Sequence, residues 1–216
     1  MEYKLIGKVI QSLHIELEPE ESIYAQEGTL AYMDSGIRRN IELNGKGFWS
    51  VIKVKLSKES IFIVKYTNSS NIRQQICFMG NSGSIFPMKI ADGHKIILRR
   101  GDYIASEKKV EIELYLSLGM MTKGNEPAFQ RITGNTEIFI STQDELIVRE
   151  LKPGEEILVD ESLIKGLYDI EESQIRFPKR FSIFKNLIAG EGMMLTSIVG
   201  PGKVYLSSSN AMRKHI

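Results

Sequence analysis

The chain has 216 residues, of which 42% are hydrophobic, and its 28 basic and 27 acidic residues give a formal net charge of +1. This composition is typical of a globular protein that buries about 70% of its unfolded surface, and the near-zero charge excludes a strong overall attraction to nucleic acid or to an acidic membrane. The single cysteine, Cys77, excludes a disulfide within the chain.

Neither a signal peptide nor a transmembrane segment is indicated by the sequence, because no run approaches the ~20 apolar residues of a membrane-spanning helix. We therefore expect a cytoplasmic protein. Cys77 lies in the apolar run Ile76-Cys77-Phe78-Met79, which predicts a buried, unreactive thiol.

One pattern occurs three times along the chain, at residues 13–30, 86–104 and 147–164. In each copy apolar and polar residues alternate, as in Leu13-His14-Ile15-Glu16-Leu17, which predicts a strand with one buried face. A turn at Pro19, at Asp92-Gly93 or at Pro153-Gly154 follows, and then a second strand.

Further strands are predicted at residues 61–64 and 110–116, where β-branched and aromatic residues gather. Each copy is predicted to close with a hairpin, at residues 51–65, 129–141 and 194–207, with Gly134 and Gly200 taking positive φ in the second and third turns. Residues 119–127 and 166–185 are predicted to form surface loops. We find no long helix.

The threefold repeat predicts an all-β protein of three similar modules at residues 1–80, 81–143 and 144–216. Three such modules can bury their apolar faces against one another around a shared pseudo-threefold axis.

Five segments of the chain carry a family resemblance: Tyr32-Met33-Asp34-Ser35-Gly36, Gly45-Lys46-Gly47-Phe48-Trp49-Ser50, Leu151-Lys152-Pro153-Gly154-Glu155, Gly190-Glu191-Gly192 and Gly200-Pro201-Gly202-Lys203-Val204. Together they resemble a bacterial, archaeal and mitochondrial family that was first described as a domain of unknown function, and whose eukaryotic members are named for altered inheritance of mitochondria.

The resemblance implies modules similar to the tryptophan RNA-binding attenuation protein (TRAP), each a short double-stranded β-helix, arranged as a pseudo-threefold β-prism. It implies no catalytic mechanism, because the family has none established. Fold similarity to an RNA-binding module does not itself transfer RNA binding.

Four arginines are the candidate polyanion-binding residues: Arg38, Arg39, Arg99 and Arg100. Equivalent positions of a threefold body could gather them into a ring that contacts phosphates. The third copy has Asp160-Glu161 where the second has Arg99-Arg100, so such a ring is incomplete.

No catalytic, metal or cofactor site is predicted. His14, His94 and His215 are far apart in sequence and lack metal-ligand spacing. Acidic pairs such as Glu20-Glu21, Glu155-Glu156 and Asp160-Glu161 are predicted to be solvated turn carboxylates, because neighbouring residues on a strand point to opposite faces.

We therefore expect a non-enzymatic β-scaffold or binding and assembly module that associates with itself through exposed sheet edges and apolar prism faces, with a protein partner as a further possibility. Two alternatives are binding of RNA or another polyanion, and binding of a small apolar ligand between the repeats.

Overall fold

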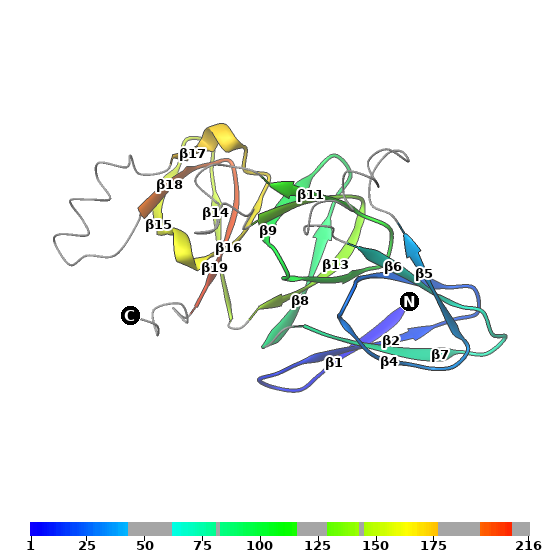
Figure 1. Cartoon of the computed structure of the whole chain (residues 1–216). Helices are drawn as coiled ribbons and strands as arrows, with labels where there is room; N and C mark the ends of the chain where they lie inside the picture. The colour runs from blue at the N-terminus through cyan, green and yellow to red at the C-terminus, as the bar shows by residue number, and fades with distance from the viewer. Residues whose placement is uncertain (43–61, 81–82, 116–128, 143–144, 177–194, 209–216) are drawn as a thin grey trace, which may run out of the picture. The chain divides into compact units, whose positions relative to one another are not determined.

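The computed structural model describes residues 1–42, 62–80, 83–115, 129–142, 145–176 and 195–208 (Figure 1). Regular structure in these residues consists of β-strands and two short 3-10 helices, η2 (Glu161–Leu163) and η3 (Glu172–Gln174), which confirms the all-β prediction. Among the described residues, no helix has both the length and the hydropathy needed to span a membrane.

The chain divides into two compact units. The first comprises Met1–Lys95, Arg100–Glu113 and Ile132–Gln143, and the second comprises Ile96–Arg99, Leu114–Arg131 and Asp144–Ile216.

The strands follow in chain order and are grouped here as three copies. The first copy contains β1 (Glu2–Ile6), β2 (Ser12–Leu17), β3 (Ser22–Gln26), β4 (Leu30–Met33), β5 (Ile37–Glu42), β6 (Ile63–Asn68) and β7 (Gln74–Met79). The second contains β8 (Ser84–Ile90), β9 (Lys95–Arg99), β10 (Tyr103–Ser106), β11 (Glu111–Tyr115), β12 (Phe129–Thr133) and β13 (Thr136–Thr142). The third contains β14 (Leu146–Leu151), β15 (Glu156–Asp160), β16 (Ile164–Tyr168), β17 (Ile175–Arg176), β18 (Leu195–Val199) and β19 (Gly202–Ser207).

The described residues form four sheets. Their strand orders are β1-β2-β7-β4 in the first sheet, β5-β6-β3-β10-β13-β8 in the second, β11-β12-β9-β16-β19-β14 in the third and β15-β18-β17 in the fourth. The order β2-β7-β4 recurs as β8-β13-β10 and as β14-β19-β16, and the order β5-β6-β3 recurs as β11-β12-β9 and as β17-β18-β15. An internal sequence repeat thus corresponds to a repeat of strand pairing.

A register irregularity marks the same place in each copy. It falls between Leu30 and Tyr32, between Tyr103 and Ala105, and between Ile164 and Gly166. Such bulges bend a strand and increase its twist. The three irregularities fix which residues of β4, β10 and β16 are equivalent.

The predicted turn after the first strand of each copy is confirmed. The backbone N–H of the fourth residue donates to the carbonyl of the first in all three: Glu21 to Glu18 at 3.0 Å, His94 to Ala91 at 3.1 Å and Glu155 to Lys152 at 3.0 Å. The third residue has positive φ each time, 65° at Glu20, 77° at Gly93 and 78° at Gly154. This geometry belongs to a type II turn, in which glycine is the easiest third residue.

The predicted closing hairpins are wrong. β12 and β13 lie in different sheets, and so do β18 and β19, so the link between them is a corner where the chain leaves one sheet for another. The predicted first hairpin lies mostly at residues 43–61, outside the described residues.

The two corner glycines are not among the positive-φ residues either. A Cβ on Gly200 would lie 2.4 Å from the carbonyl oxygen of Lys152, and one on Gly134 would lie 3.1 Å from Cγ1 of Val110. Glycine is required at Gly200 because the corner passes close to the turn of its own copy.

Part of the second predicted loop is also strand, since β16 contains Gly166 and β17 follows at Ile175. The other predicted loop, 119–127, lies outside the described residues.

The predicted alternation is clearest in β2, where Leu13, Ile15 and Leu17 are fully buried. Each such side chain stabilises the fold by about 1.5–3 kcal/mol through burial. They belong to the core of the first unit, together with Phe78 and Phe139, while Leu167, Ile198 and Val204 lie in the core of the second unit.

Candidate functional site

Neighbouring copies are joined by pairing between specific strands. β3 of the first copy pairs with β10 of the second, where Tyr24 lies opposite Ser106. β9 of the second pairs with β16 of the third, where Ile97 lies opposite Leu167. Because β3 and β9 are equivalent strands, as are β10 and β16, one junction is made twice.

In each of these two sets of equivalent strands, the third member forms no such junction within the described residues. β15 is the third member of the set formed by β3 and β9, and β4 is the third member of the set formed by β10 and β16. Within the described residues, β4 ends the first sheet and β15 ends the fourth. Each presents a row of backbone N–H and C=O groups to which another strand can be added.

Side-chain exposure identifies these edges as unusual. Tyr32 on β4 is 42% exposed and Leu158 on β15 is 64% exposed. Of their equivalents at the formed junctions, Ala105 is 0% exposed, Ile97 is 1% exposed and Tyr24 is half-buried. Side chains at these positions are therefore less exposed where the junction forms than where it is missing.

In the part of the chain that the structure describes, the outer edge of β14 is also open. Ile147 and Val148 are 49% and 51% exposed, so the prediction that Ile147 faces the core is wrong. The alternation in the sequence is real, but β14 lies at the edge of the third sheet, where its side chains have neighbours on one side only.

Polar side chains form a network on the outer face of the first sheet. His14 lies with Nε2 2.9 Å from Oγ of Ser12 and with Nδ1 3.1 Å from the hydroxyl of Tyr32, and that hydroxyl donates to Oε1 of Gln75 at 2.8 Å. Sγ of Cys77 is 3.6 Å from Nε2 of His14. Strand pairing places His14 directly opposite Cys77, although they are far apart in sequence.

This cysteine–histidine pair is not arranged for nucleophilic chemistry. Cys77 is buried, as the sequence predicts, and burial raises the pKa of its thiol. A raised pKa keeps the thiol protonated, whereas a nucleophilic cysteine needs a lowered one. No group of metal-ligating side chains occurs within the described ranges.

Arg99, one of the four candidate polyanion-binding arginines, is committed to internal contacts. Its guanidinium donates to the carbonyl oxygens of Ile164 at 2.9 Å, Ser162 at 3.1 Å and Glu161 at 3.3 Å. It also lies over the ring of Phe129, 5.2 Å from the centroid. Arg99 therefore fixes the η2 segment.

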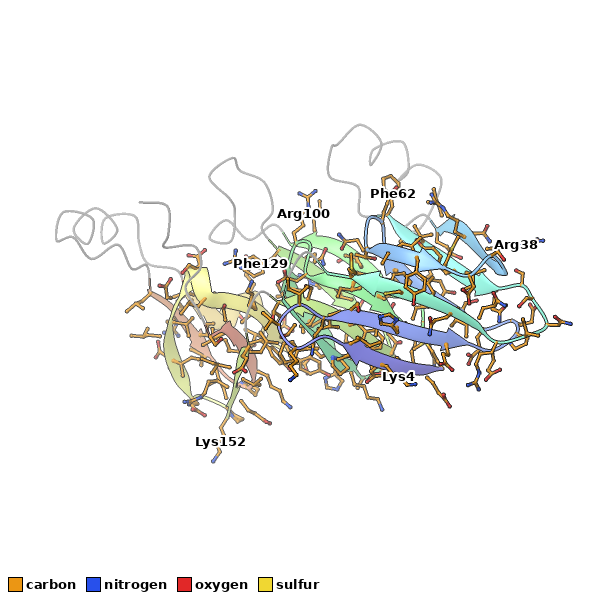
Figure 2. The ribbon with its side chains drawn as sticks, turned by 90° about the horizontal axis from the view of Figure 1, so that it is seen from below. Lys4, Arg38, Phe62, Arg100, Phe129 and Lys152 are labelled. Atoms are coloured by element: carbon orange, nitrogen blue, oxygen red, sulfur yellow. The ribbon has the colours of Figure 1, made fainter. Side chains whose placement is uncertain are left out.

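The other three candidates are placed differently. Arg38 and Arg39 are exposed on β5, and Arg100 is half-buried. Figure 2 shows the side chains of Arg38 and Arg100 pointing away from the ribbon at separate places on the first unit. These two arginines are not brought together.

Two of the acidic pairs serve the turns. The carboxylates of Glu21 and Glu155 accept the backbone N–H groups of Glu18 at 2.9 Å and Lys152 at 3.0 Å. These bonds to the charged form lower the pKa of both carboxyls. Asp160 caps η2 by accepting the backbone N–H of Ser162 at 3.0 Å.

A pocket of about 360 Å³ lies at the corner of the second copy. Its lining is polar: Asp92, Gly93, His94, Lys109, Glu111, Thr133, Gly134 and Asn135. It does not match the predicted small apolar ligand, because ligand pockets of that kind are lined mainly by apolar side chains.

Comparison with known proteins gives a family and a fold. A search of curated proteins finds no match. A crystal structure of a Streptococcus pyogenes protein is similar, with a TM-score of 0.71, 18% sequence identity, and coverage of 98% of this chain and 95% of that one. At that identity the likeness supports the all-β fold and carries no function. The family model described as Mitochondrial biogenesis AIM24 matches residues 3–209, in agreement with the resemblance found in the sequence, and the chain therefore belongs to this family.

Proposed function

We propose that the protein is a non-enzymatic assembly module: three TRAP-like modules arranged as a pseudo-threefold β-prism, whose open sheet edges bind further protein. The observation that carries this proposal is the pair of open edges that lie where the other copies make junctions. The proposed module boundaries, 1–80, 81–143 and 144–216, fall between β7 and β8 and between β13 and β14.

Assembly is tested by native mass spectrometry of the purified protein. An oligomer without a retained ligand supports the assembly function, whereas a monomer that retains a metabolite overturns it. Bound nucleic acid that is lost as salt rises would favour the polyanion alternative, for which Arg38 and Arg39 are the exposed candidates.

Two further observations favour a protein that is not an enzyme. The thiol of Cys77 is buried and its pKa is raised, and the carboxylates of Glu21 and Glu155 fix backbone N–H groups of the turns. A free, buried cysteine suits a reducing compartment, which favours a cytoplasmic location.

A further inference from the structure

The three copies treat the outer edge of their first strand in different ways. In the first copy β1 pairs along β2 and covers that edge, with Lys4 opposite His14. In the second copy β8 carries Pro87 at the position equivalent to His14, opposite Phe139 of β13. In the third copy the equivalent residue is Val148, opposite Tyr205 of β19.

Proline protects a sheet edge because it removes a backbone donor and does not fit a further hydrogen-bonded strand. The edge of β2 is thus already occupied by β1, and the edge of β8 resists strand addition. β14 has neither a covering strand in the described part of the chain nor a proline, and it exposes Ile147 and Val148.

The hydrogen-bonding direction of β14 can be read from its partner. The backbone N–H of Ser208, which follows β19, donates to the carbonyl of Glu145 at 2.9 Å. In an antiparallel pair, N–H and C=O of one residue point to the same side, and the side alternates along the strand. Glu145, Ile147 and Arg149 therefore face β19, and Leu146 and Val148 face the open edge.

The segment Glu145-Leu146-Ile147-Val148-Arg149 is complementary to a second copy of itself in the antiparallel direction. With Ile147 opposite Ile147 on the two-fold axis, Leu146 of each chain lies opposite Val148 of the other, and both face the shared edge. Glu145 then lies opposite Arg149 at both ends. Moving the two-fold axis by two residues, so that Arg149 lies opposite itself, would place like charges together, which is unfavourable.

We propose that β14 is the site at which a second copy of this chain binds, through two-fold antiparallel pairing of residues 145–149 that joins the third sheets of the two molecules. The proposal rests on the assembly function above and names its surface. Arg149 also forms an ion pair with Glu155 at 3.2 Å within its own chain, with both side chains partly exposed. Any test must therefore separate this internal pair from the pair with Glu145 of the second copy.

The first test uses Val148→Pro, which copies the natural proline of β8. The substitution removes an edge-facing donor and should make the protein monomeric in sedimentation velocity over a wide concentration range, with the wild-type circular dichroism spectrum retained. Val148→Thr is the matched control, because it keeps the donor and the β-branched shape and should still dimerise.

The second test reverses charges. Glu145→Arg alone and Arg149→Glu alone should each weaken dimerisation about tenfold, because each places like charges opposite one another in two places. The double variant should recover the wild-type dimer, although it does not restore the internal pair between Arg149 and Glu155.

The outcomes are distinguishable. A wild-type protein that is monomeric at all concentrations would refute both this inference and the assembly function. A wild-type oligomer that is unchanged by Val148→Pro and by the charge reversals would refute the β14 interface alone. A double variant no better than Arg149→Glu would show that only the internal ion pair matters, and would also refute it.

Discussion

The side chain of Asn68 lies at the end of β6, where the chain leaves one sheet for another on its way to β7. It offers the sharpest test of this corner of the first copy. It is fully buried, and its Nδ2 donates to the carbonyl oxygens of Leu17 at 2.9 Å and Ile72 at 2.8 Å. Its Oδ1 accepts from the backbone N–H of Ser70 at 3.0 Å and from the hydroxyl of Ser70 at 2.7 Å. One side chain thus links β2 to the segment between β6 and β7.

Asn68→Ala removes all four of these hydrogen bonds. The bond to Leu17 is buried and its loss costs about 2 kcal/mol, while the three partly exposed bonds contribute about 0.5 kcal/mol each because water replaces the lost partner. Water entering the corner recovers part of this sum. We expect the free energy of unfolding to fall by about 3 kcal/mol.

Urea denaturation followed by circular dichroism measures this loss, provided that the denaturant dependence is unchanged. The control is Ser70→Ala, which removes one partner at a partly exposed position and should cost about 1 kcal/mol or less. If Asn68→Ala were no more destabilising than Ser70→Ala, the side chain would not hold the corner. The backbone bonds of Asn68, which an alanine keeps, would then be sufficient.

Four further predictions follow from single contacts. Gly154→Ala should lower the free energy of unfolding by about 1 kcal/mol, because φ is 78° at this residue and no atom lies within 4 Å of the new Cβ. Glu20→Gly, at the equivalent position of the first turn, should be mildly stabilising. Unchanged urea midpoints for both variants would contradict this. Burial raises the pKa of the Glu161 carboxyl, so the folded state favours its protonated form, and stability is lost as the carboxyl ionises when pH rises above about 4.5. Glu161→Gln removes the ionised form and should therefore raise the melting temperature at neutral pH by more than in acid. Arg99→Met should lower the free energy of unfolding, measured by urea denaturation, by about 3 kcal/mol, because three carbonyl oxygens lose the hydrogen bonds that Arg99 donates. Arg38→Met, at an exposed site, should change stability by less than about 0.5 kcal/mol, and a larger loss would show a structural role.

Features set by neighbouring residues could be predicted from the sequence. The alternation of β2 follows from the two-residue period of a strand, and the three turns follow from proline and glycine at fixed places. The closing hairpins were wrong because a short link containing Gly134 or Gly200 looks the same whether its strands pair or pass to different sheets. The pairing of strands about 60 residues apart decides this, and no local pattern contains it.

The candidate arginines show the same limit at the level of single side chains. Arg99 and Arg100 are adjacent and chemically identical, yet Arg99 binds three carbonyls of a segment more than 60 residues away. The contact between His14 and Cys77 was missed for the same reason. The open edge of β14 did have a signal in the sequence: aligned copies place Val148 where the second copy has Pro87.

In each copy the last strand pairs with a strand from the beginning of the copy, and this affects how the chain folds during synthesis on the ribosome. β2 needs β7, β8 needs β13 and β14 needs β19, so no copy can complete its sheet until nearly all of its residues have left the exit tunnel. β3 then waits longer still for β10. The nascent chain therefore gains its structure in three delayed steps of high contact order, and its incomplete sheets are the species that chaperones must shield.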